Sequence, residues 1–125
     1  MVEDEPHVLV VSADAPPTGV ERALLAAGLR VSAASLAEPV MARTRVVRPD
    51  IIVVAYRKVD RHRAWNVLTV RRGSREPRAT PVVVATDDAE QVDVFRDRFA
   101  GMGIGVLIGP DDATLVDEVR RRAAS

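Results

Sequence analysis

Residues 50–58 read Asp-Ile-Ile-Val-Val-Ala-Tyr-Arg-Lys, with four consecutive apolar residues of the kinds that favour β-structure. A Pro-Asp turn precedes this run, and a polar loop follows it. An apolar run without alternation is typical of a strand that is covered on both faces, as in the centre of a parallel sheet. The segment therefore predicts the central strand of an α/β sheet, and we expect that strand to end at Ala55.

Four further segments have the character of strands, and helical patterns separate them. Residues 7–11, 81–85 and 105–108 are apolar runs, whereas residues 29–34 alternate in polarity, as expected for a half-exposed edge strand. Helices are predicted at 19–27, from 35 to about 47, from 60 to about 71, from 88 to 101, and from 111 or 112 to about 122. Alternation of strand and helix requires a parallel sheet with helices on both faces. We therefore expect one domain, residues 1–125, with the architecture of a three-layer α/β sandwich.

Side chains that cap helices define most of these predicted starts. Thr18 with Glu21, and Ser35 with Glu38, have the spacing of a capping box, in which each partner satisfies a free amide of the first turn. Asp60, Asp88 and either Asp111 or Asp112 are the expected caps of the three later helices.

The composition excludes several classes of function. The chain has no cysteine, which excludes disulfides, thiolate nucleophiles and cysteine-ligated metal sites. Its 18 basic and 18 acidic residues balance, so no overall field attracts nucleic acid or an anionic membrane. No apolar run approaches the roughly 20 residues of a membrane helix, and the acidic N-terminus lacks the features of a secretory signal. We therefore expect a cytoplasmic protein.

Charge is nevertheless unevenly distributed along the chain. Between residues 57 and 78, basic residues outnumber the acids Asp60 and Glu76, so this span favours a phosphate backbone or an acidic partner, or is simply a solvated face. Trp65 lies off the predicted apolar stripe of its helix, and either anchors an interface or packs partly buried. Asp14 and Asp87 either hold a metal ion weakly or cap turns and helices.

The repeated strand–helix order, a Pro-Asp before the third strand, a threonine after the fourth and a Gly-Pro after the fifth resemble the receiver domain of bacterial response regulators. The resemblance covers residues 7–122. It implies a flavodoxin-like fold, with a five-stranded parallel sheet in the order 2-1-3-4-5 flanked by five helices.

The chain departs from this family at the positions that carry its chemistry. The family's paired acids, which hold magnesium, are matched by Ser12 and Ala13; its phosphoacceptor aspartate is matched by Ala55, and its lysine by Gly109. Thr86 alone matches the family, at the hydroxyl residue that closes on the phosphoryl group. Magnesium prefers carboxylate ligands, and phosphoryl transfer to a side chain needs a nucleophile. We therefore expect a vestigial pocket with no metal, no cofactor and no catalysis.

These observations lead to the hypothesis of a pseudo-receiver, a phosphorylation-independent signalling module that binds another protein or itself and is not an enzyme. An alternative is a small-molecule or nucleotide sensor that uses the vacated pocket above Ala55. A third hypothesis, nucleic-acid association through residues 57–78, predicts salt-sensitive binding, and we expect none at physiological salt.

The resemblance also implies an interface on the fourth helix, the fifth strand and the fifth helix. The charged residues that it places there are Asp93, Arg96, Asp97, Arg98, Asp117, Arg120 and Arg121. Acids and bases mixed on one surface pair reciprocally across a two-fold axis, but exposed ion pairs contribute only ~0–1 kcal/mol each. We therefore expect at most a weak homodimer.

Overall fold

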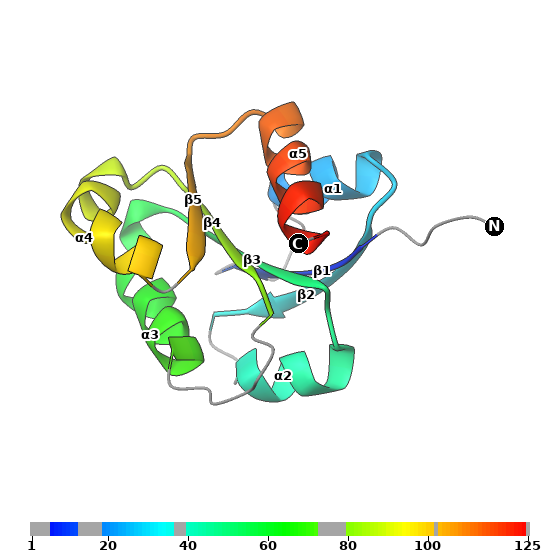
Figure 1. Cartoon of the computed structure of the whole chain (residues 1–125), viewed down its shortest axis with the longest axis horizontal. Helices are drawn as coiled ribbons and strands as arrows, with labels where there is room; N and C mark the ends of the chain where they lie inside the picture. The colour runs from blue at the N-terminus through cyan, green and yellow to red at the C-terminus, as the bar shows by residue number, and fades with distance from the viewer. Residues whose placement is uncertain (1–5, 13–18, 37–39, 73–79, 102, 125) are drawn as a thin grey trace.

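The computed structural model describes residues 6–12, 19–36, 40–72, 80–101 and 103–124, without the side chains of residues 40, 41, 43, 45 and 67–72. These residues form an α/β fold with a five-stranded parallel sheet in the order β2-β1-β3-β4-β5 (Figure 1). This is the predicted strand order, and it is that of flavodoxin-like doubly wound sheets.

Helices alternate with the strands along the chain. The strands are β1 (His7–Ser12), β2 (Arg30–Ser35), β3 (Ile51–Tyr56), β4 (Val82–Thr86) and β5 (Ile104–Ile108). The helices are α1 (Gly19–Ala26), α2 (Val40–Val47), α3 (Arg61–Arg72), α4 (Ala89–Gly101) and α5 (Asp112–Ala123), with a short 3₁₀ helix, η1 (Lys58–Asp60), before α3.

Strand β3 lies between β1 and β4, and each of its six residues is buried. Its register places Val53 beside Val10 on one side and beside Val83 on the other. The prediction of a central strand covered on both faces is therefore confirmed, although the strand continues one residue beyond Ala55, to Tyr56.

The two faces of the sheet are covered by different kinds of side chain. Helices α1 and α5 cover one face, where Leu24, Leu115 and Val119 pack on strand residues such as Val53 in a core without aromatic rings, which we call the aliphatic layer (Figure 1). Helices α2, α3 and α4 lie on the other face (Figure 1). We call this face the aromatic layer because it contains every aromatic side chain of the protein: Tyr56, Trp65, Phe95 and Phe99.

The predicted start of the second helix is wrong. Ser35 does not open a helix but ends β2, where it pairs with Ser12, and the Leu36 amide donates to the Ser12 carbonyl at 2.9 Å. Helix α2 begins at Val40, directly after Pro39. The ladder to β1 thus prevails over the local capping pattern, because it satisfies the same backbone groups and buries Leu36.

Two predicted caps are confirmed. The Asp111 carboxylate accepts a hydrogen bond from the Thr114 amide at 2.7 Å, and Asp88 accepts one from the Gln91 amide at 3.3 Å. Asp60 lies in η1, immediately before α3. Thr18 lies outside the described residues. Within the described ranges, no helix combines the length and the apolar character that crossing a bilayer requires.

Candidate functional site

The strand register places the predicted vestigial pocket along the carboxyl ends of the strands. Ala55 lies beside Ser12 in the β1–β3 ladder, and Thr86 ends the neighbouring strand β4. The Gly109 amide donates to the Thr86 carbonyl at 2.9 Å, which brings the turn after β5 to the same edge. Ala13 lies outside the described residues.

The side chains at this edge are already enclosed by protein. Ser12, Ala55 and Thr86 are all buried, with at most 8% of their surface exposed. Gly109 is exposed and has a φ of +54°, a conformation that favours glycine. The turn therefore explains the glycine at this position. The receiver family has a lysine there.

Thr86 and Tyr56 are the centre of a polar network that joins the loops after β3 and β4. The Thr86 hydroxyl accepts a hydrogen bond from the Asp88 amide at 3.1 Å and shares another with the Tyr56 hydroxyl. Tyr56 donates to the Gln91 side-chain oxygen at 2.6 Å. Burial raises the pKa of Tyr56 to about 12, and the hydrogen bond with Thr86 opposes this shift.

Ion pairs connect the same two loops. The Arg61 guanidinium contacts the fully enclosed Asp88 carboxylate at 2.6 Å. The Lys58 amide donates to the Asp87 carboxylate at 2.9 Å, and its ammonium contacts Glu90 at 3.0 Å. We call this set the loop clamp; its members are Tyr56, Lys58, Arg61, Thr86, Asp87, Asp88, Glu90 and Gln91.

The hydrogen bonding of the Arg61–Asp88 pair is incomplete. Arg61 Nε and Asp88 Oδ2 are buried without a hydrogen-bond partner in the protein, so one contact holds the two groups together. A buried charge pair contributes little net stability, because desolvation offsets its Coulombic attraction, but removing one partner is costly. The clamp therefore depends on both residues being present.

Sequence reasoning missed the loop clamp, although a signal for it exists. Tyr56 ends β3 and is followed by Arg-Lys, Asp-Asp follows β4, and the carboxyl ends of adjacent parallel strands meet at one edge. Of the two residues that the sequence offers as weak metal ligands or caps, Asp87 accepts a hydrogen bond from the Lys58 amide, and Asp14 is outside the described residues. Where side chains are described, no group of three His, Asp or Glu side chains could hold a metal ion.

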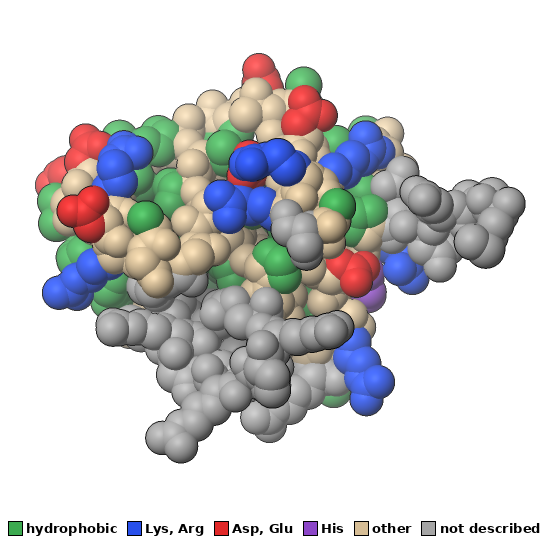
Figure 2. Space-filling model, viewed as in Figure 1, with side chains coloured by type: hydrophobic (Ala, Val, Ile, Leu, Met, Phe, Trp, Pro, Cys, Tyr) green, Lys and Arg blue, Asp and Glu red, His purple; other side chains and the backbone are tan. Residues whose placement is uncertain are grey.

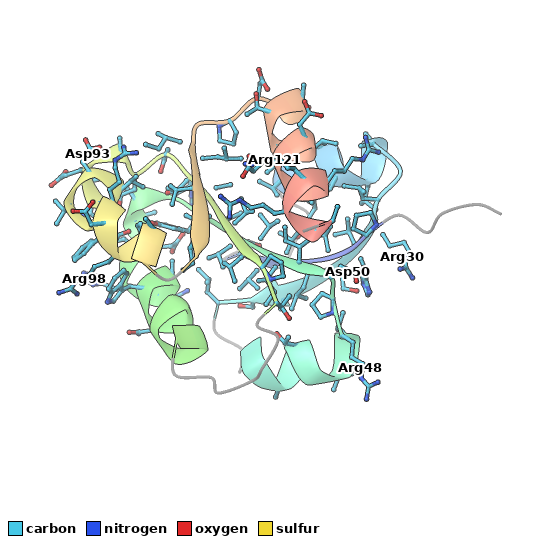
Figure 3. All side chains as sticks on the ribbon, viewed as in Figure 1. Arg30, Arg48, Asp50, Asp93, Arg98 and Arg121 are labelled. Atoms are coloured by element: carbon cyan, nitrogen blue, oxygen red, sulfur yellow. The ribbon has the colours of Figure 1, made fainter. Side chains whose placement is uncertain are left out.

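The predicted interface residues do not form one face. Arg98 lies with its guanidinium carbon 5.6 Å from the centroid of the Phe95 ring, on the side of α4 that faces α3 (Figure 3). Arg120 donates to the Ala27 carbonyl at 2.9 Å, at the end of α1. The structure thus places these two residues away from the α4–β5–α5 surface.

The other five predicted interface residues are exposed on α4 and α5. Asp93 and Arg96 form an ion pair of 3.1 Å within α4, and Arg121 contacts Glu118 within α5 at 2.6 Å. Acidic and basic side chains therefore occur side by side on these two helices (Figure 2). Asp97 and Asp117 form no ion pair with any described residue.

Glu118 organises the surface between α5 and β5. It also accepts a hydrogen bond from Arg122, and its bonds to Arg121 and Arg122 lower its pKa. The Arg122 side chain lies against Gly105 of β5, at a place that a larger residue would block.

In the basic span, residues 57–78, the exposed basic side chains include Arg57, Lys58, His62 and Arg63. The side chains of residues 67–79 lie outside the described part of the chain.

No protein-family model matches this chain, and no curated protein sequence matches it.

Proposed function

We propose that this protein is a pseudo-receiver, a non-enzymatic signalling module that acts by binding another protein without being phosphorylated. The parallel sheet in the order 2-1-3-4-5, with Thr86 at the end of β4 and Gly109-Pro110 after β5, supports the relation to receiver domains. Fold alone does not carry function, so the proposal depends on the residues at the carboxyl edge.

The observation that carries the proposal is the loop clamp. In the receiver family, a threonine in this position closes on a phosphoryl group carried by the third strand. Here Ala55 supplies no nucleophile, and the Thr86 hydroxyl is engaged by Tyr56 and the Asp88 amide. Side chains thus hold together the loops that a phosphoryl group would otherwise control, which supports a constitutive arrangement.

A two-dimensional amide NMR spectrum tests this proposal. Addition of magnesium with acetyl phosphate, or with beryllofluoride, should leave the resonances of Ala55, Thr86 and Gly109 unchanged. Ala55→Asp should respond no better, because Ser12 and Ala13 supply no carboxylate for magnesium and Gly109 supplies no cation. Specific shifts in the wild-type spectrum would overturn the proposal.

The proposal includes a protein partner and, at most, a weak homodimer. The exposed acids and bases on α4 and α5 supply a surface on which two copies pair reciprocally across a two-fold axis. Its members, after removal of Arg98 and Arg120, are Asp93, Arg96, Asp97, Asp117 and Arg121. We call this the α4–α5 surface.

A further inference from the structure

A second surface lies between α3 and α4 and is built around aromatic rings. Trp65 of α3 stacks on Phe95 of α4, with 4.7 Å between ring centroids, and meets Phe99 edge-on at 5.9 Å. Phe99 is buried, but Trp65 and Phe95 each keep part of their surface exposed. Arg98 covers the Phe95 ring in a cation–π contact.

Two exposed valines lie in α4 and in η1, the short helix before α3. Val94 precedes Phe95, lies one helical turn before Arg98 and is 71% exposed. Val59 in η1 is 75% exposed and follows Lys58, whose ammonium contacts Glu90, one turn before Val94. Each valine is thus close in sequence to one partner of the Lys58–Glu90 ion pair. We call Val59, Trp65, Val94, Phe95 and Arg98 the α3–α4 seam.

Lys58 and Arg61, two of the cations around the seam, have carboxylate partners. Arg57, Arg63 and Arg98 are exposed and form no ion pair with a described residue. The side chains one turn before Arg98 are Val94 and Phe95. A guanidinium that rests on an aromatic ring beside apolar surface has the composition of an interface hot spot, in which Trp and Arg are enriched. A carboxylate is the partner to which a guanidinium can donate two parallel hydrogen bonds.

We propose that the α3–α4 seam docks an acidic peptide segment of a partner protein. Apolar side chains of that segment cover Val59, Val94 and the exposed part of Trp65, and one of its carboxylates pairs with Arg98. This inference rests on the proposed function and names the surface and the partner chemistry for it. It is separate from the α4–α5 surface, which uses other residues of α4 and is proposed for self-association.

Selection from a phage-displayed library of random 16-residue peptides tests the seam, with the full chain as bait. Peptides that also bind the Val94→Ser/Arg98→Glu double variant are removed by counter-selection. Both positions are exposed, so the variant should fold, and far-UV circular dichroism checks this. The remaining peptides should combine acidic with apolar residues.

The strongest selected peptide is then synthesised and titrated against the protein. Trp65 is the single tryptophan, so its fluorescence reports on the seam directly. Arg98→Glu and Val94→Ser should each weaken binding at least tenfold. Val46→Ser is the matched control, because Val46 is 77% exposed on α2, and its affinity should equal that of the wild type.

Three outcomes overturn the inference: no enrichment, enrichment of basic peptides, or peptides that bind the seam variants as tightly as the wild type. Binding of single-stranded oligodeoxythymidine at Arg98, without acidic peptides, also overturns it in favour of a nucleic-acid surface. If the peptides bind elsewhere on the protein, the inference about the seam is wrong, but the proposed function is unaffected. A change in the amide NMR spectrum on addition of beryllofluoride would overturn the proposed function, regardless of the peptide results.

Discussion

The guanidinium of Arg122 lies directly over Gly105, so that a Cβ atom added to Gly105 would stand 2.5 Å from Arg122 Cζ and 2.8 Å from Nη2. The edge strand β5 is thus covered by a charged side chain of α5, which Glu118 holds in place. The absence of a side chain at Gly105 is what admits this arrangement.

Gly105→Ala should therefore depend on Arg122 for its effect. Alanine in a strand gains about 0.5–1 kcal/mol over glycine, so Gly105→Ala should stabilise an Arg122→Ala background. In the wild type, the methyl group displaces the guanidinium from Glu118 and cancels or reverses this gain. Urea unfolding of the double-mutant cycle should give a coupling of about 1 kcal/mol or more. Gly101→Ala, at an exposed helical position with open space, is the control and should show no coupling.

Breaking the Arg61–Asp88 pair should be the most destabilising charge change in the loop clamp. Arg61→Met leaves the enclosed Asp88 carboxylate without its cation, and we expect a loss of roughly 2–4 kcal/mol in the free energy of unfolding. Adding Asp88→Asn should recover part of this loss, because asparagine still caps α4.

Lys58→Met provides the matched comparison for the ion pair. Lys58 and Glu90 are both mostly exposed, so their pair should contribute no more than about 1 kcal/mol. Chemical denaturation of the wild type, Arg61→Met, Arg61→Met/Asp88→Asn and Lys58→Met gives the free energy of unfolding of each protein. Equal losses for Arg61→Met and Lys58→Met would show that the clamp is not a buried electrostatic unit.

Tyr56 should make stability depend on pH in the alkaline range. An unfolded tyrosine ionises near pH 10, whereas burial raises the pKa of Tyr56 to about 12. Its contribution is intact below pH 10, and stability falls between pH 10 and 12, because the unfolded chain loses the proton first. The slope attributable to this group is at most about 1.4 kcal/mol per pH unit.

The chain's single tyrosine makes this prediction directly measurable. Absorbance at 295 nm follows ionisation of Tyr56 alone and should give a midpoint near 12 in the folded protein. Tyr56→Phe should abolish this alkaline contribution. At neutral pH it should cost about 1–3 kcal/mol, because the Gln91 and Thr86 side chains lose their shared partner. A midpoint near 10 in the folded protein would contradict the prediction.

Self-association through the α4–α5 surface should be weak and sensitive to charge. Sedimentation at several concentrations should detect a dimer that Asp97→Arg or Arg121→Glu alone weakens and that the combined change partly restores. Arg120→Glu is the control, because Arg120 points to α1. A strictly monomeric wild type, or a dimer that Arg120→Glu disrupts equally, would exclude this surface.

Nucleotides should not stabilise the protein. Ser12, Ala55 and Thr86, which would border a sensor pocket, are buried, and the hydroxyl of Thr86 already has protein partners. A thermal-shift screen should show no rise in melting temperature. A rise in proportion to the logarithm of ligand concentration would favour the sensor hypothesis.

The sequence predicted the sheet better than the site. Apolar runs such as residues 51–54 are stable as strands buried on both faces, and their alternation with helices indicated a parallel sheet. The strand order, which the structure confirms, was predicted from the resemblance to receiver domains. The capping pattern at Ser35 failed because a strand partner 23 residues earlier, Ser12, competes for the same backbone groups, and no local pattern contains that information.

Side-chain direction was the other limit. The resemblance implies one face for Arg98 and Arg120, but Arg98 lies over the Phe95 ring and Arg120 donates to the Ala27 carbonyl beside α1. The loop clamp needed Tyr56, Arg61 and Asp88 in three dimensions, because each residue alone also fits a core or a solvated role. Trp65 shows the same difficulty: it lay off the predicted stripe, yet it packs into the aromatic layer because α4 supplies Phe95 and Phe99.

The division between the aromatic and aliphatic layers places all near-UV chromophores of the protein on one face of the sheet. Every chromophore that absorbs above 250 nm lies on the α3–α4 face, and the α1–α5 face is silent in fluorescence and near-UV circular dichroism. Loosening of α5 would leave those signals intact while helical ellipticity declined. Coincidence of the two melting curves is therefore a direct measure of whether β3, buried between the layers, couples both faces into one cooperative unit.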